Sequence, residues 1–432
     1  MAGTLKQTRS QKDDEDYISL LPDGIIHHFF SFLCMRDIVK TCVSSIRVMT
    51  LHGWGKVRKF HLDINSEHCP LNDDLIEHIF SFLPTRDVVK TCVLSSRWRS
   101  YWPTVLDLRF SVSSPHDSFV DRVLKLYGRS KVRKFHLDIN SKSFCPSKID
   151  SWVGFAIDHQ VEELLLDFNI WCVDCPLSPL LYNCSSLTNL RLSGCCFPFI
   201  ENISWSSLQS LSIHDMDVSD DLLRKILMGS PVLEYLNLER CWGIKGIRST
   251  SLKELVIESI GVEFPLHIST PQLLSLSVRG FYFDKIISIV EAPSLLEAEL
   301  DFDGPIRSDF CQLKKMLFQP QNATRVLFGP SCVQVMCAQI EDVQVSLPNC
   351  KSLTLHVAIP EFSFSPIANM LATIPNLEKL NISDLDSYNF DDSCNLDHTS
   401  YWHIKKKFKH RARHLKNVEI FGFHGCLRFN YE

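Results

Sequence analysis

The chain has 432 residues, of which 45% are hydrophobic and 22% charged, with a formal net charge of −5. This is ordinary globular composition, and the acidic balance argues against nucleic-acid binding, which leaves a basic footprint. No apolar run is long enough to cross a bilayer, and charges fill residues 1–16, where a signal peptide needs an apolar core. We therefore expect no membrane binding, a location in the nucleus and/or cytoplasm, and a disordered N-terminus over residues 1–16.

The N-terminal part of the chain is duplicated. Residues 21–47 repeat residues 71–97, with 17 of 27 positions identical, and KVRKFHLDINS occurs at residues 56–66 and again at 131–141. We assign a first copy with its linker to residues 17–66 and a second copy to residues 67–105. The first copy has Val48 and His52 where the second has Trp98 and Trp102. Replacing a large buried side chain by a smaller one is costly, so we expect the second copy to be the working one.

The second copy is predicted to form three short helices. Apolar residues between Leu75 and Leu83 recur at helical spacing, and Pro84 should end the first helix. The hydroxyl of Thr85 is suited to cap the second helix, and the two tryptophans supply the apolar face of a third. Three helices in about thirty residues do not enclose a core alone. The apolar surplus therefore points to another protein, or else to a larger core in this chain.

The same stretch, LNDDLIEHIFSFLPTRDVVKTCVLSSRWRSYW, resembles the F-box of a large plant protein family. The resemblance implies docking to a Skp-type adaptor and, through it, to cullin and RING subunits that carry ubiquitin chemistry. The residues that we expect to bind the adaptor are apolar or aromatic residues and one proline: Leu71, Leu75, Ile76, Ile79, Phe80, Leu83, Pro84, Val88, Val89, Cys92, Trp98 and Trp102.

From residue 106 to residue 400 the chain carries an irregular LxxLxL repeat. Its units begin at Val132, Val161, Leu187, Leu208, Leu233, Leu252, Leu273, Leu295, Ala323, Cys350, Leu377 and, beyond residue 400, Leu415. Because side chains alternate along a strand, the fourth and sixth positions of each unit should be buried, and the third, fifth and seventh should face outward. This period is that of a leucine-rich repeat. We predict an α/β solenoid with parallel strands on the concave side and helices or loops on the convex side.

Four residues take the Asn or Cys position that follows each repeat strand. They are Asn140, Asn169, Cys195 and Cys241, and we expect them to pack or hydrogen-bond inside the turn. Residues 401–432 contain HLKNVEIFGFHG, which resembles the first part of the FBD module that closes many plant F-box proteins with leucine-rich repeats. The segment is shorter than the family pattern.

Outward strand positions are the expected contacts of a target protein. The candidates are Arg191, His214, Tyr235, Asn237, Glu239, Glu258 and Arg279. Two functions fit: a substrate-recognition subunit of an SCF-type ubiquitin ligase, or a leucine-rich-repeat scaffold that has lost adaptor binding. A repeat protein that senses a small ligand is a further alternative.

Catalysis has little support in the sequence. Cys172 and Cys175 lie near Cys184, Cys195 and Cys196, but a zinc site needs four ligands in defined geometry, and Cys195 already has a repeat position. We therefore expect no metal, no cofactor, no catalytic residue and no enzymatic activity. The basic run at residues 403–416 reads as a solvated connector or as a nuclear-import or docking signal.

Overall fold

The computed structural model describes residues 80, 83–90, 96–114, 118–128, 131–140, 146–168, 176–198, 202–259, 266–281, 287–303, 316–317, 320–337, 346–357, 371, 374–384, 414–421 and 427–430. The chain forms two compact units. Unit 1 comprises Met1–Val112 and His116–Leu137, and unit 2 comprises Ser113–Pro115 and Asp138–Glu432. The first copy of the duplication and residues 1–16 lie outside the described residues.

Unit 1 contains short helices followed by strands. The elements are α4 (Thr85–Lys90), α5 (Ser96–Tyr101), the 3-10 helix η2 (Trp102–Thr104), β1 (Asp107–Val112), α6 (Phe119–Leu126) and most of β2 (Lys134–Ile139). As predicted, Pro84 lies immediately before a new helix. The predicted cap is wrong, however, because the Thr85 hydroxyl accepts the backbone N–H of Arg109 at 2.7 Å. The second helix is thereby fastened to strand β1.

Aromatic side chains fill the centre of unit 1. The ring of Phe110 lies between those of Phe119 and Phe135, with centroids 6.3 and 5.7 Å away. The guanidinium of Arg86 on α4 lies 4.4 Å from the ring centroid of Phe119. The buried hydroxyl of Tyr127 donates to the carbonyl of Val105 at 2.8 Å. The helices of the second copy and the first strand therefore share one core.

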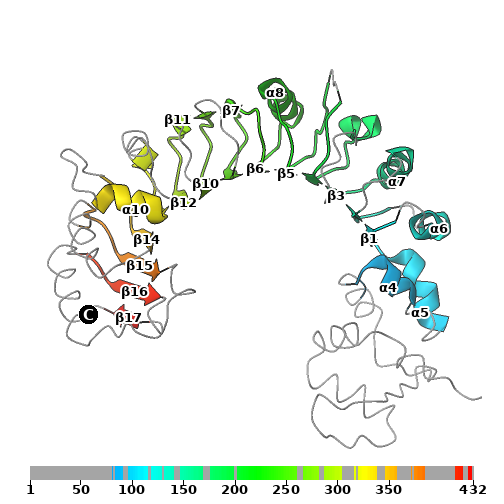
Figure 1. Ribbon diagram of the computed structural model, residues 1–432, viewed down its shortest axis with the longest axis horizontal. Coiled ribbons are helices and arrows are strands. Elements are labelled where there is room, and N and C mark those ends of the chain that lie inside the picture. The colour runs from blue at the N-terminus through cyan, green and yellow to red at the C-terminus, as the bar shows by residue number, and fades with distance from the viewer. Residues whose placement is uncertain are drawn as a thin grey trace, which may run out of the picture. The chain divides into compact units, whose positions relative to one another are not determined.

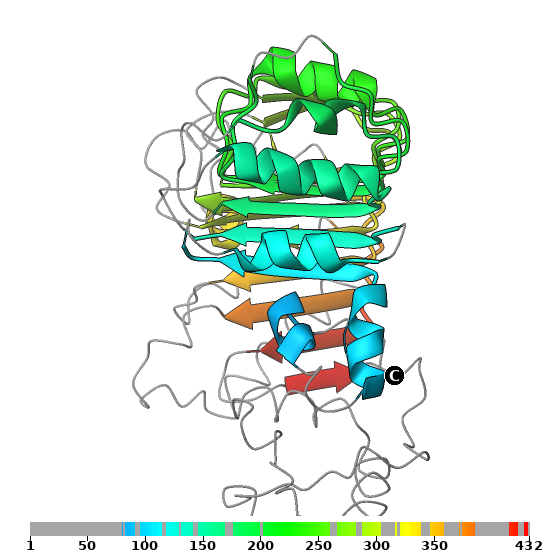
Figure 2. The ribbon, with the colours of Figure 1, turned by 90° about the vertical axis from the view of Figure 1, so that its right-hand side faces the viewer.

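Unit 2 is built on a long, mainly parallel sheet (Figure 1). Its strands in order are β3 (Glu163–Phe168), β4 (Asn189–Ser193), β5 (Ser210–His214), β6 (Tyr235–Glu239), β8 (Glu254–Glu258), β10 (Ser275–Phe281), β12 (Glu297–Asp303), β13 (Arg325–Phe328), β14 (Ser352–Val357), β15 (Lys379–Asp384), β16 (Asn417–Phe421) and β17 (Leu427–Asn430). Among these described strands only the last pair is antiparallel, and the arrow of β17 points against that of β16 in Figure 2.

The repeat positions predicted from sequence are confirmed. All twelve residues that open a unit are buried, and Leu415 is the most exposed of them at 7%. Each unit provides one strand, and consecutive strands pair in register, so that Leu211, Leu236 and Leu255 lie side by side. The periodic leucines thus form a continuous apolar layer behind the sheet.

The other side of unit 2 is only partly helical. The helices are α7 (Pro146–Asp158), α8 (Asp220–Gly229) and α10 (Pro330–Cys337), with the 3-10 helix η3 (Pro179–Asn183). Between α8 and α10 a second parallel sheet takes their place, with the order β11 (Ile287–Glu291), β9 (Leu266–Ser269), β7 (Gly246–Arg248). Figure 1 shows it on the same outer side as α8. The prediction of helices or loops on this side was therefore incomplete.

The turns after the strands repeat one backbone conformation. Gly194, Asp215, Arg240 and Ser259 follow the ends of β4, β5, β6 and β8, with φ of 65°, 53°, 47° and 51°. Each donates its backbone N–H to a carbonyl of the next repeat strand at 2.8 to 3.1 Å, namely to His214, Glu239, Glu258 and Arg279 in that order. This left-handed conformation favours glycine, yet three of the four residues have side chains. This row of hydrogen bonds, which we call the ladder, therefore extends the sheet by one left-handed residue per repeat.

The residues in the predicted Asn or Cys position differ from one another. Cys195 and Cys241 are buried as expected, and the Cys241 thiol donates to the carbonyl of Ile213 at 3.3 Å. Asn140 is exposed, and its side-chain amide donates to the carboxylate of Asp138 at 2.9 Å, so its assignment to the turn interior was wrong. Asn169 lies outside the described residues. Among the helices that the structure describes, none has the length and apolarity to span a membrane.

Candidate functional site

The first candidate surface is the helical segment that resembles an F-box. Of its twelve predicted adaptor residues, Phe80, Leu83, Val88 and Trp102 are buried within this chain. Pro84, which precedes α4, is exposed, and Val89 within α4 is half-buried. Leu71, Leu75, Ile76, Ile79 and Cys92 and the side chain of Trp98 lie outside the described residues.

The burial of these side chains shows that this segment contributes to a core within the chain. The helices were expected to lack a core, but α4 lies against β1 and shares the aromatic interior of unit 1. The apolar surplus of the described part is therefore largely used inside the chain. Of the predicted adaptor residues whose side chains the structure describes, Pro84 and Val89 are the two that are not buried.

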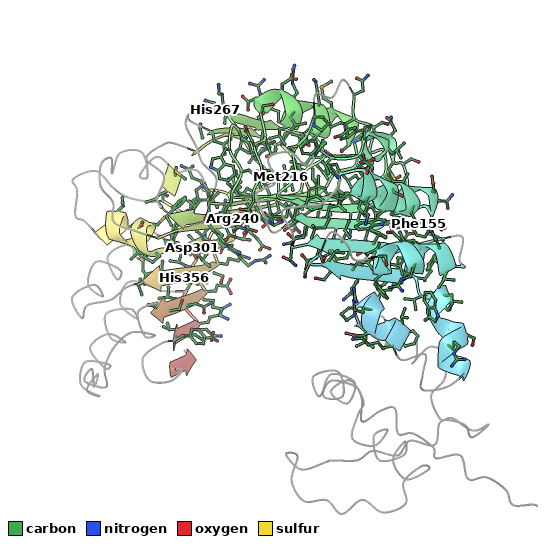
Figure 3. All side chains as sticks on the ribbon, turned by 45° about the vertical axis from the view of Figure 1, so that its right-hand side comes forward. Phe155, Met216, Arg240, His267, Asp301 and His356 are labelled. Carbon is green, nitrogen blue, oxygen red and sulfur yellow. The ribbon has the colours of Figure 1, made fainter. Side chains whose placement is uncertain are left out.

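The second candidate surface is the side of the unit 2 sheet that faces away from the leucine layer, which we call the open face. Three outward side chains per strand line it in rows. The row at the carboxyl ends of the strands, which we call the third row, runs Ser193, His214, Glu239, Glu258, Arg279, Asp301, Gly329 and His356. In Figure 3, Arg240, Asp301 and His356 lie along this side, whereas His267 lies on the outer sheet.

One polar cluster on the open face centres on Glu239. Its carboxylate accepts from Nδ1 of His214 at 2.5 Å and pairs with the guanidinium of Arg240. Arg240 also binds both carboxylate oxygens of Asp215, at 2.6 and 2.8 Å. Burial, followed by the charge of Arg191, lowers the pKa of His214. His214 is therefore a neutral donor through Nδ1, and its Nε2 is a buried acceptor without a partner.

A second polar cluster links β10 to β12. Arg279 binds both carboxylate oxygens of Glu299, at 2.8 and 2.7 Å, and the Ser277 hydroxyl donates to the same carboxylate at 2.8 Å. Asp301, also on β12, accepts from His356 of β14 at 3.1 Å. The first contacts join neighbouring repeats, and the contact of Asp301 with His356 joins repeats that are separated by β13.

The predicted target residues therefore divide into two sets. Arg191, Tyr235, Asn237 and Glu258 lie on the open face, and their side chains form no hydrogen bond or ion pair within the part of the chain that the structure describes. His214, Glu239 and Arg279 are engaged in the internal clusters. His214 was predicted to face outward but is only 3% exposed, and its Nδ1 is bonded to Glu239.

Glu254 belongs to the first set, although it was not predicted. It is exposed on β8, two residues before Val256, in the third position of the unit that begins at Leu252. Its outward position could have been found from the repeat pattern alone. With Glu258, it places two carboxylates without side-chain partners in the described structure on one strand.

The cysteines of the described residues show no arrangement for metal or redox chemistry. No group of three or more His, Cys, Asp or Glu side chains there is placed to hold a metal ion. Cys184 and Cys195 are buried and Cys196 is half-buried, while Cys172 and Cys175 lie outside the described residues. Burial raises the pKa of Cys241 to about 12, which keeps its thiol protonated.

Comparison with known proteins gives matches to the two segments of the chain that carry the candidate surfaces. Residues 69–109 match the F-box domain, and residues 149–298 match the repeats described as "FBD-associated F-box protein At5g56370, LRR repeats". The F-box match covers the second copy, and that the first copy is also an F-box stays a prediction.

Curated relatives from Arabidopsis thaliana share this organisation. The chain is 30% identical to F-box/LRR-repeat protein At3g03360 over 317 residues, which are 68% of this chain and 65% of the relative, so slightly less than two thirds of that relative is spanned. It is 34% identical to F-box/LRR-repeat protein 25 over 56% of this chain and 76% of the relative. It is 31% identical to putative F-box protein At1g49610 over 68% of this chain and 77% of the relative. The chain belongs to the plant family of F-box proteins with FBD-associated leucine-rich repeats.

Proposed function

We propose that this protein is the substrate-recognition subunit of an SCF-type cullin-RING ubiquitin ligase. The observation that carries the proposal is the F-box match at residues 69–109, followed by a parallel sheet with an open polar face. In this proposal the helices of the second copy bind a Skp-type adaptor, and the open face binds a target protein. The cullin and RING subunits join through the adaptor, in the nucleus and/or cytoplasm.

The proposed mechanism is proximity. Holding a target beside a loaded ubiquitin-conjugating enzyme converts an encounter in solution into an effectively intramolecular one. The chain then needs affinity for two proteins and no catalytic group of its own. Mixed charge on the open face suits a protein target, whereas a polyanion would need a basic stripe.

The proposal is tested by co-expressing the full chain with a plant Skp-type adaptor and cullin and purifying through a tag on the chain. We expect all three to elute together at high salt. Ile79→Asp in the second copy should remove adaptor and cullin together, whereas Phe29→Asp, the matched change in the first copy, should not. Circular dichroism should show that both variants keep the wild-type fold.

A folded chain that elutes alone contradicts the proposal. That result favours a leucine-rich-repeat scaffold that binds its partner for another purpose. Loss of binding by the Phe29→Asp variant alone would assign the dock to the first copy.

A further inference from the structure

The open face between β4 and β8 carries buried hydrogen-bond acceptors that lack donors. Nε2 of His214 and Oδ1 of Asn237 are both shielded from solvent and have no partner in the described structure. His214 is only 3% exposed, and its neighbours Arg191 and Glu239 belong to the open face. Buried polar atoms are nearly always paired in folded proteins, so two such acceptors in adjacent strands mark a place where donors are missing, which an outside group reaches once the covering side chains move.

The surface around these acceptors has the charge that attracts a donor. In the described structure, the carboxylates of Glu254 and Glu258 on β8 form no side-chain hydrogen bond or ion pair. The guanidinium of Arg191 on β4 also forms none. Glu258 also lies directly beside Glu239 of β6 in the strand register. Like charges in that position repel, and although Arg240 pairs with Glu239 and Arg279 lies beside Glu258 in the register, a further cation reduces the repulsion that remains.

An apolar and aromatic floor lies beside the carboxylates. Val256 is half-buried between Glu254 and Glu258, and Tyr235 of β6 lies next to Glu254 in the register. Such a floor accommodates the methylene stem of a long side chain, while an aromatic ring face attracts its cationic head. Lysine and arginine combine a long stem with several N–H donors and a positive charge.

The dimensions favour a peptide segment over a single small cation. Glu254 and Glu258 are four residues apart along one strand, which is about 13 Å, and β5, β6 and β8 together span about 10 Å. We therefore propose that this patch, made of His214, Tyr235, Asn237, Glu254, Val256 and Glu258, binds a target segment through lysine or arginine side chains. The inference rests on the proposed function, in that it assigns the chemistry of the target to the open face.

The test selects binders for the full chain from a random twelve-residue peptide library displayed on phage. We expect the selected peptides to be enriched in lysine and arginine. Selection on Glu254→Lys with Glu258→Lys should lose that enrichment. Asp158→Lys with Asp221→Lys makes the same change in net charge on helices α7 and α8, away from the open face, and should keep it.

A synthetic peptide from the wild-type selection then measures the strength of the contact. Its affinity should fall about tenfold with Glu258→Gln, which keeps the size of the side chain and removes its charge. Absence of basic enrichment on the wild-type chain overturns the inference, and so does enrichment that survives the two substitutions on β8.

Adaptor binding by the same variants separates this inference from the proposed function. The β8 variants should still co-purify with the Skp-type adaptor, because β8 belongs to unit 2. If the wild-type chain selects basic peptides but binds no adaptor, the ligase proposal fails and the patch stands. If it binds adaptor but selects no basic peptides, only the patch is wrong.

Discussion

Asp301 on β12 and His356 on β14 form an ion pair of 3.1 Å across an intervening strand that places no side chain between them. Gly329 directly follows β13, and continuing the register of β12, β13 and β14 by one residue places it between Asp301 and His356. A Cβ atom at residue 329 would lie 2.2 Å from Oδ1 of Asp301. The pair therefore depends on a glycine in a position that is otherwise an outward side chain.

Gly329→Ala should destabilise unit 2. The added methyl would also lie 2.7 Å from the Asp301 Cα and from the Phe302 backbone nitrogen, so the strand itself must shift. We expect the free energy of unfolding, measured by urea titration, to fall by about 1–3 kcal/mol.

Gly128→Ala is the matched control, because a Cβ there meets nothing within 4 Å. It should leave the free energy of unfolding unchanged or raise it slightly. Equal losses from the two substitutions would show that the close approach at Gly329 has no energetic importance.

The same ion pair predicts a pH dependence of stability. The hydrogen bond to Asp301 raises the pKa of His356, so the folded state holds its proton more tightly than the unfolded state. The contribution of His356 to the free energy of unfolding is therefore full below the ordinary histidine pKa of about 6.5, and it is lost as pH rises through the raised pKa. We expect the stability difference between wild type and His356→Gln to stay below about 1 kcal/mol, given solvent screening, and to shrink with rising pH.

His214 provides the contrasting case in the same titration. Burial lowers the pKa of His214. Its contribution to the free energy of unfolding is therefore full above the ordinary histidine pKa, and it is lost as pH falls from that value through the lowered pKa. The stability difference between wild type and His214→Gln should therefore grow with rising pH. Parallel slopes for the two variants would contradict the assignment of a charged His356 and a neutral His214.

Ser259→Gly should stabilise the chain. Ser259 has a φ of 51°, where a side chain is strained, and its contribution to the ladder is a backbone N–H that glycine also supplies. We expect a gain of about 0.5–1 kcal/mol in the free energy of unfolding. Ser210→Gly, at the start of β5, gives the control, because glycine in a strand of ordinary conformation should cause a loss of similar size. A loss at both positions would argue against strain at residue 259.

Cysteine labelling should follow burial. Cys184, Cys195, Cys241, Cys332 and Cys350 are buried, and burial raises the pKa of the last three. Because the thiolate is the reactive form, iodoacetamide should modify Cys196 in the folded chain well before these five. Peptide mass spectrometry after timed labelling assigns each site. Rapid modification of Cys241 before unfolding would show that its turn opens.

The repeat architecture could be predicted because each unit carries its own signal. Leu211 and Ile213 alternate with Ser210 and Ser212, and the same alternation recurs in every strand of the series, so the buried positions followed without reference to tertiary structure. The outer sheet was missed because β7, β9 and β11 are only three to five residues long and lie between the repeat motifs. The alternation of buried Leu266 and Ile268 with exposed His267 was the available signal.

The open face could be predicted only in part. Which side chains point outward follows from alternation within one strand, and this placed Arg191, Asn237 and Glu258 correctly. Whether an outward side chain is bonded within the chain depends on side-chain contacts between strand residues that are 20 to 55 positions apart in sequence. Examples are Arg279 with Glu299 and Asp301 with His356. That pairing requires the register of several strands and, at residue 329, the absence of a side chain.

The most direct test of the proposed ligase role is calorimetric titration of the full chain with a purified plant Skp-type adaptor. We expect one adaptor to bind per chain. Leu75→Asp should abolish binding, whereas Ile25→Asp, the matched change in the first copy, should keep it. Circular dichroism and urea titration establish that both variants are folded. No heat of binding from the folded wild-type chain, or equal loss in the two variants, would contradict the assignment of the dock to the second copy.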